Sequence, residues 1–140
     1  MGEAREVMDR VTEAVFKKDL EALKALYAPT AVAETPEGTL NGPDAIAEYL
    51  GEFLVAFPDA SFESVHAHES GANAIDEGYF VGTHTGPLTG PDGEIIDATG
   101  NTVRLRECDI ATVEGGVVTS HRFYFDNVEF MQQLGLGPES

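Results

Sequence analysis

Two carboxylates on one predicted strand are the residues of this sequence best suited to chemistry. The segment 102–113 has the alternation of a β-strand, and successive side chains of a strand point to opposite faces. Glu107 and Asp109 therefore share a face with the apolar Val103 and Leu105. Burial in an apolar pocket raises the pKa of a carboxyl toward the range useful for proton transfer. The other interpretation is a sheet face whose central carboxylates point to water.

Two histidines have positions from which they could partner these carboxylates. His84 is flanked by glycines, which permit a close approach of the backbone, so we expect it at the rim of a pocket. His121 alternates with Phe123 and Phe125, which places it among aromatic side chains on one strand face. For both histidines, the alternative is a buried, hydrogen-bonded residue of the core.

Other candidate sites have simpler explanations. His66 and His68 have the i, i+2 spacing of a metal pair on a strand, but no third ligand is indicated, so a surface pair is favoured. The sequence contains no zinc signature, phosphate-binding loop or nucleophile elbow. We expect no metal and no cofactor. Asp126 and Glu129 have the spacing of a capping box, which assigns Asp126 to the start of a helix.

The predicted helices precede most of the predicted strands. Helical spacing of apolar residues predicts helices over 3–18, 20–27 and 43–57. After a short strand over 31–34 and the third helix, the period becomes two, which predicts strands over 60–69, 72–85, 102–113 and 117–125 and then a helix over 127–134. This order indicates an α+β fold with the helices on one face of the sheet. A curled sheet wrapped on helix 43–57 leaves a hollow for a small hydrophobic molecule.

Length and charge limit the class of protein. The 140 residues fit one domain, 1–140. A net charge of −17 repels nucleic acid, anionic membranes and strongly anionic substrates, and a salt-rich habitat is a second explanation for it. The single cysteine, Cys108, cannot form an internal disulfide. No signal peptide and no apolar run of about 20 residues is visible, so we expect a cytoplasmic protein without a membrane span.

Several segments together resemble one known family. They are GTHTGPLTG at 82–90, ATGNTV at 98–103, EGGVVTSH at 114–121, and the tail from YFD at 124–126 to QLGL at 133–136. In this order they resemble the SnoaL-like ester cyclases of the nuclear transport factor 2-like superfamily, over essentially the whole chain. The resemblance implies a cone-shaped α+β fold. In it, a curved antiparallel or mixed sheet wraps on three N-terminal helices around a deep pocket, with a short C-terminal helix. It also implies a homodimer formed through the outer face of the sheet.

The resemblance also implies an enzymatic activity. The name-giving members close a ring of an aromatic polyketide by an aldol step without a cofactor. Position by position, His84, Glu107, Asp109 and His121 match polar or histidine positions of the family. The catalytic aspartate of the family falls two residues after the last histidine, and this chain has Phe123 there. The usual proton-transfer group is therefore absent from its usual place.

We therefore expect a cofactor-independent proton-transfer enzyme of the cyclase or isomerase type, using aldol or enolisation chemistry on a hydrophobic carbonyl compound. Asp109 would be the base and His84 the orienting or oxyanion-binding group, with Glu107 and His121 as further catalytic candidates. The residues expected to line the substrate pocket are Phe123, Tyr49, Phe53 and Leu105.

Two other functions remain open. A non-catalytic domain that binds a hydrophobic ligand is the main alternative, because Phe123 makes the pocket more apolar. A hydrolase of the epoxide type, which uses two acids bridged by an arginine, ranks last. Arg104 and Arg106 lie on the strand face opposite Glu107 and Asp109.

Overall fold

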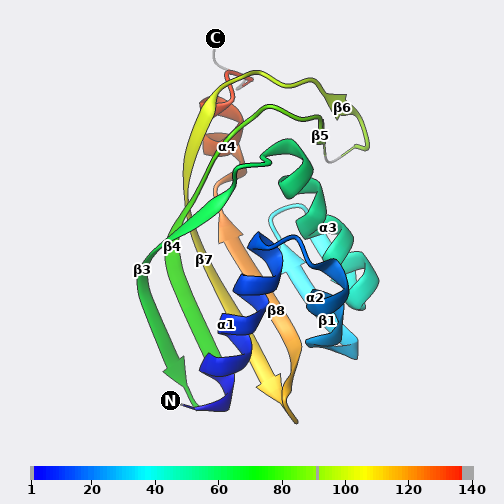
Figure 1. Ribbon diagram of the computed structural model, residues 1–140, viewed down its shortest axis with the longest axis vertical. Helices are drawn as coiled ribbons and strands as arrows, with labels where there is room; N and C mark the ends of the chain where they lie inside the picture. Colours follow the sequence, from blue (N-terminus) through cyan, green and yellow to red (C-terminus); the bar gives the residue numbers. More distant parts are fainter. Residues whose placement is uncertain (1, 91, 137–140) are drawn as a thin grey trace.

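The computed structural model describes residues 2–90 and 92–136. Its helices are α1 (Glu3–Phe16), α2 (Leu20–Ala25), α3 (Pro43–Ala56) and α4 (Asn127–Gln133). Its strands are β1 (Tyr27–Thr35), β2 (Gly38–Asn41), β3 (Ser61–Ser70), β4 (Asn73–Thr83), β5 (Leu88–Thr89), β6 (Ile95–Ile96), β7 (Thr102–Glu114) and β8 (Val117–Phe125). Figure 1 shows the long strands curving behind α1, with α4 at one end of the molecule.

The described strands form one curved sheet and a small hairpin. The sheet has the order β2-β1-β8-β7-β4-β3, and β5 pairs with β6. Neighbours in the sheet are antiparallel except β1 and β8, which are parallel. Helix α1 packs on β4 and β7 and α3 packs on β1 and β2, so the helices cover one face (Figure 1). The predicted α+β fold with a curved, mixed sheet is confirmed. The homodimer through the outer face stays a prediction.

Hydrophobic side chains form two core clusters between the helices and the sheet. Met8 and Val11 of α1 belong to one cluster, which includes Ala111 of β7. Phe57, at the end of α3, and Phe130 of α4 belong to the other. Full burial of one such large side chain stabilises a fold by about 1.5–3 kcal/mol. The clusters fix α1, α3 and α4 around the part of the sheet where the carboxylates of β7 point inward.

The predicted elements differ from the structure mainly around residue 27. The second helix ends at Ala25, so the prediction of helix through Tyr27 was wrong. Strand β1 begins at Tyr27 instead of Ala31 and contains Pro29. A proline cannot donate a ladder hydrogen bond, and the β1–β8 register shifts between Tyr27 and Val32, where the strand accommodates it. The short strands β2, β5 and β6 were not predicted.

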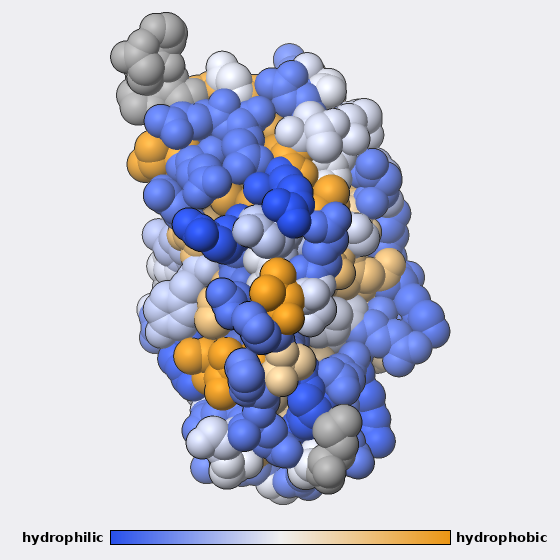
Figure 2. All heavy atoms as spheres, turned by 90° about the vertical axis from the view of Figure 1, so that its left-hand side faces the viewer, coloured by the Kyte–Doolittle hydropathy of each residue, from blue (hydrophilic) through white to orange (hydrophobic). Residues whose placement is uncertain are grey.

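The surface reflects the acidic composition. Figure 2 shows the molecule from the side on which β3 lies, and most of this face is hydrophilic, with hydrophobic side chains in small separate patches. No helix in the described part of the chain is long and apolar enough to cross a membrane. The cytoplasmic location and the single domain stay predictions.

Candidate active site

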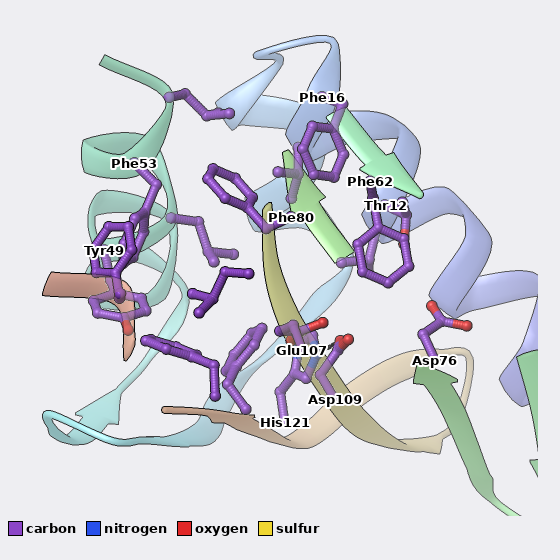
Figure 3. A pocket seen from close by; sticks show the side chains of 18 residues that line it. Thr12, Phe16, Tyr49, Phe53, Phe62, Asp76, Phe80, Glu107, Asp109 and His121 are labelled. Carbon is purple, nitrogen blue, oxygen red and sulfur yellow. Dashed lines mark hydrogen bonds and ion pairs between the residues drawn. The ribbon is translucent and has the colours of Figure 1, made fainter. Parts of the chain in front are cut away.

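A cavity of about 110 Å³ lies between α1, α3 and the inner face of the sheet. Most of its wall is aromatic or aliphatic, with Tyr49 and Phe53 of α3 on one side and Leu105 of β7 and Phe123 of β8 among the sheet residues. Figure 3 shows the aromatic side chains around the hollow and a polar group on the sheet side, where Glu107, Asp109 and His121 lie together. The cavity is therefore apolar with its carboxylates concentrated at one wall.

The Asp109 carboxylate is held by a hydrogen-bonded chain of buried side chains. The Nε2 atom of His121 lies 2.6 Å from Oδ2 of Asp109, and the Nδ1 atom of His121 lies 2.6 Å from the hydroxyl of Tyr27. A carboxylate only accepts hydrogen bonds, so Nε2 of His121 donates to Asp109. Burial raises the pKa of Tyr27, so its hydroxyl keeps its proton beside Nδ1 of His121. This chain of hydrogen bonds orients the Asp109 carboxylate.

Strand register explains how these residues meet. Asp109 lies opposite Phe123 and Ala111 lies opposite His121 in the β7–β8 pair. His121 is therefore a diagonal neighbour of Asp109 on the same face, within reach of its carboxylate. The ring of Phe123 stacks on the ring of His121, with 4.0 Å between the ring centroids. The imidazole is thus fixed by stacking as well as by hydrogen bonds at both nitrogens.

Glu107 adds a second carboxyl beside the Asp109 carboxylate. Burial raises the pKa of Glu107 well above its usual range, and the charge of nearby Asp109 raises it further. A carboxyl whose pKa is raised keeps its proton to a higher pH than usual, and in the protonated form it can donate a hydrogen bond. When two titratable groups in one site have their pKa values pushed apart, one can serve as acid and the other as base.

A buried ion pair lies next to this carboxyl pair. Asp76 of β4 lies opposite Asp109 in the β4–β7 register, and its carboxylate is 2.7 Å from a guanidinium nitrogen of Arg5 in α1. Burial and the charge of Asp109 raise the pKa of Asp76, whereas the charge of Arg5 opposes this. Arg5 therefore neutralises one of the acidic groups that line the cavity.

The structure places His84 apart from the other predicted catalytic residues. His84 is fully buried, but it is not among the residues that line the cavity. Its Nδ1 atom accepts a hydrogen bond from the backbone N–H of Thr99 at 3.2 Å and lies 3.0 Å from the Thr99 hydroxyl. Burial lowers the pKa of His84. In this position the imidazole joins the chain after β4 to the chain before β7.

The structure places the other predicted residues either at the cavity or at the start of a helix. Glu107, Asp109 and His121 meet at the cavity, and the four residues expected to line it do so: Phe123, Tyr49, Phe53 and Leu105. Asp126 caps α4, since its carboxylate accepts from the backbone N–H groups of Val128 and Glu129. Within residues 2–90 and 92–136, no group of three or more potential metal ligands is brought together.

Sequence reasoning missed Tyr27, Arg5 and Asp76. Tyr27 was assigned to a helix, which hid its position on the strand next to β8. Arg5 lies between the buried Ala4 and Val7 of α1, and Asp76 alternates with the buried Ala74 of β4. Arg5 and Asp76 are charged residues of opposite sign, each inside an apolar pattern. This was a signal that the inner faces of α1 and β4 meet in an ion pair.

The curved sheet covered by helices, with an apolar cavity between them, defines a protein of the nuclear transport factor 2-like fold. The model of the SnoaL-like polyketide cyclase family matches residues 5–134. The chain therefore belongs to the SnoaL-like polyketide cyclase family. A search of the curated proteins found no match.

Solved structures share the fold at low sequence identity. A candidate SnoaL-like polyketide cyclase from Jannaschia sp. CCS1 is 15% identical, with a TM-score of 0.84 over 97% of this chain and 94% of the other. IdmH, a candidate polyketide cyclase from Streptomyces antibioticus, is 23% identical, with a TM-score of 0.79 over 96% and 99%. A protein of ketosteroid isomerase-like fold from Catenulispora acidiphila, solved with trimethylamine, is 17% identical, with a TM-score of 0.74 over 94% and 93%.

Proposed function

We propose that this protein is a cofactor-independent proton-transfer enzyme of the cyclase or isomerase type, acting on a hydrophobic carbonyl compound. The observation that carries the proposal is the Asp109 carboxylate in an apolar cavity, held at Oδ2 by His121. Membership of the SnoaL-like polyketide cyclase family supports this class of reaction. One fold hosts many functions, so the assignment rests on the site rather than on the fold.

The site can carry out an enolisation with its own residues. Oδ1 of Asp109 takes a proton from the carbon next to the substrate carbonyl, and the C–H electron pair moves onto the carbonyl oxygen as an enolate. The protonated Glu107 donates a hydrogen bond to the developing negative charge, the kind of stabilisation that contributes most in such reactions. His121 and Tyr27 do not contact the substrate in this scheme; they position the base.

Two outcomes of the enolate are open to this site. In an isomerisation, Asp109 returns its proton to a different carbon of the same molecule. In an aldol closure, the enolate carbon attacks a second carbonyl of the same molecule, and the resulting alkoxide takes the proton from Asp109. Both outcomes conserve the proton within the site and require no cofactor.

The position of Phe123 fits a base that has moved to the neighbouring strand. Phe123 occupies the position at which the family resemblance expects the catalytic aspartate, and Asp109 lies directly opposite it across the β7–β8 pair. A carboxylate at 109 reaches the same region of the cavity from β7 instead of β8. The stacked Phe123 in turn keeps His121 behind the base.

Hydrogen exchange at a simple ketone tests the assignment. The wild-type protein should accelerate exchange of the benzylic hydrogens of phenylacetone in D₂O, followed by ¹H NMR. Asp109→Asn removes the base but keeps the shape, so it should abolish the acceleration. Asp44→Asn, at a side chain that is 94% exposed, is the matched control and should keep it. Unchanged exchange in a folded Asp109→Asn protein would rule out Asp109 as the base.

A non-catalytic hydrophobic-ligand-binding domain is the second candidate function. It is favoured by the aromatic lining and by Phe123 at the position of the expected catalytic aspartate. In that case the wild-type protein would bind phenylacetone without accelerating its exchange, and Asp109→Asn would bind it equally well. Binding by calorimetry and exchange by NMR on the same samples separate the two functions.

A further inference from the structure

The ring of Phe53 forms part of the cavity wall on α3 and lies at the centre of an aromatic cluster. Its centroid is 5.2 Å from that of Tyr49, 6.1 Å from Phe80, 6.3 Å from Phe125 and 6.0 Å from Phe130. All of these rings line the cavity. Edge-on aromatic contacts are favourable beyond the area that they bury, so the cluster holds the ring of Phe53 in place. Figure 3 shows Phe53 on the side of the hollow away from Asp76.

A second, smaller hollow lies on the other side of this wall. Its volume is about 10 Å³, and it is bordered by Leu88 and Thr89 of β5 and by α4. Tyr49, Phe53 and Phe130 line both this hollow and the cavity. The three aromatic side chains therefore separate the cavity from the space beneath β5.

The volume of the cavity limits the size of the ligand. About 110 Å³ is less than the ~150 Å³ of an apolar cavity that holds benzene. Protein interiors are closely packed, and the walls of a cavity relax only in part. One ring therefore fits beside the carboxylates, whereas two fused rings need space that the aromatic wall occupies.

We propose that Phe53 is a specificity-determining residue that limits the ligand of this cavity to a single ring. Removing its phenyl group joins the cavity to the hollow beneath β5 and admits a second fused ring. The choice of a ketone as the ligand rests on the proposed function. The size limit rests on the aromatic wall, and it applies equally to a domain that binds a hydrophobic ligand without catalysis.

Two ketones that differ by one fused ring test this inference by binding alone. Calorimetry should show that wild-type protein binds phenylacetone more tightly than 2-naphthylacetone, although the larger ketone is the more hydrophobic. Phe53→Ala should reverse this order. Its affinity for 2-naphthylacetone should rise about tenfold over wild type, because the second ring becomes buried. Val55→Ala, at a side chain of the same helix that is 57% exposed, is the matched control and should keep the wild-type order.

A second variant and a second readout allow for the loss of packing in Phe53→Ala, which removes a large side chain from the cluster. Phe53→Leu keeps more of the packing and should shift the preference in the same direction by a smaller factor. Circular dichroism establishes that each variant is folded. A ligand that binds only the folded state raises the melting temperature, so 2-naphthylacetone should stabilise Phe53→Ala more than wild type.

Several results would overturn the inference. They are wild-type protein that binds both ketones equally well or neither at millimolar concentration, folded Phe53 variants that keep the wild-type order, or a reversed order in Val55→Ala. None of these readouts involves catalysis. The size limit at Phe53 can therefore fail while Asp109-dependent exchange of phenylacetone holds, and the reverse result is equally distinguishable.

Discussion

At the residue scale, the site depends on two adjacent inward positions of β7 that hold their protons differently. Asp109 is bound by the N–H of His121 and serves as an acceptor. The pKa of Glu107 is raised, chiefly by burial, so this carboxyl keeps its proton to a higher pH. A base beside an acid in an apolar cavity is the arrangement that enolisation requires. The same arrangement should have a cost in stability that depends on pH.

Replacing Glu107 by Gln should stabilise the protein increasingly as pH rises. The pKa of Glu107 is raised in the folded state, so unfolding releases a proton at any pH between about 4.3, the ordinary value for Glu, and the folded value. In that window the folded state binds more protons than the unfolded state, and stability falls with rising pH. Glutamine does not titrate, so this loss should be absent in the variant.

Melting temperatures measured by circular dichroism across the pH range check this expectation. The gap between Glu107→Gln and wild type should widen from acid to neutral pH. Glu114→Gln, at an exposed residue of the same strand, should run parallel to wild type. A constant gap for Glu107→Gln would mean that Glu107 is ionised in the folded protein at neutral pH, and the proposed acid would be lost.

At the element scale, α1 is attached to the sheet by a buried ion pair as well as by its apolar stripe. Arg5 contacts Asp76 and Asp9, and it also donates to the backbone carbonyl of His68 in β3. One side chain therefore links α1 to two strands beside the cavity. The helix position that forms one cavity wall depends on this contact.

Arg5→Met should destabilise the protein by about 3 kcal/mol, because it leaves the Asp76 carboxylate buried without its partner. Urea unfolding followed by circular dichroism measures the change in free energy. Lys17→Met removes the exposed pair with Glu13 on the same helix and should have a much smaller effect, since solvent screens such pairs. Equal effects of the two variants would show that the buried pair does not anchor α1.

Much of the fold was predictable from local patterns, whereas the contacts within the site were only partly so. Strict alternation in 102–113 correctly put Leu105, Glu107 and Asp109 on one face, because side-chain direction in a strand is a local property. The junction at Tyr27 was not predictable in this way. Leu26 and Tyr27 continue the apolar stripe of the helix, and Pro29 is as compatible with a helix end as with an irregular strand. Pairing with β8, a long-range interaction, decides between them.

The contacts of the two histidines were also beyond what local sequence patterns can predict. Glycines around His84 are compatible with a pocket rim or with a tight buried turn, and the partner that distinguishes them, Thr99, lies on the far side of a loop. His121 was placed among aromatic residues by alternation, and its neighbours Phe123 and Tyr27 agree with that. Its contact with Asp109 depends on the β7–β8 register, which strand patterns alone do not determine.

At the scale of the whole molecule, the dominant property is the net charge of −17. Like charges on a compact surface repel, and this repulsion destabilises the folded state relative to an expanded chain. Salt screens the repulsion, with a screening length of about 10 Å at 0.1 M ionic strength. The exposed carboxylates should therefore make stability depend on ionic strength.

Raising NaCl from about 0.02 M to about 0.5 M should raise the melting temperature, because screening weakens the repulsion between surface carboxylates. Scanning calorimetry at constant pH measures the change. Choline chloride is a useful control, since a similar gain with either salt indicates screening rather than a bound cation. A melting temperature that stays constant or falls would show that the acidic surface does not limit stability.

The chain of hydrogen bonds through Tyr27, His121 and Asp109 means that catalytic activity can report whether the sheet has assembled. Its members come from β1, β8 and β7, so Tyr27 lies in one half of the sequence and its partners in the other. A chain cut between His84 and Asn101 divides the site into two inactive fragments. Recovery of ketone exchange on mixing the fragments would then report that β1 and β8 have paired, which makes the reaction itself an assay for assembly of the sheet.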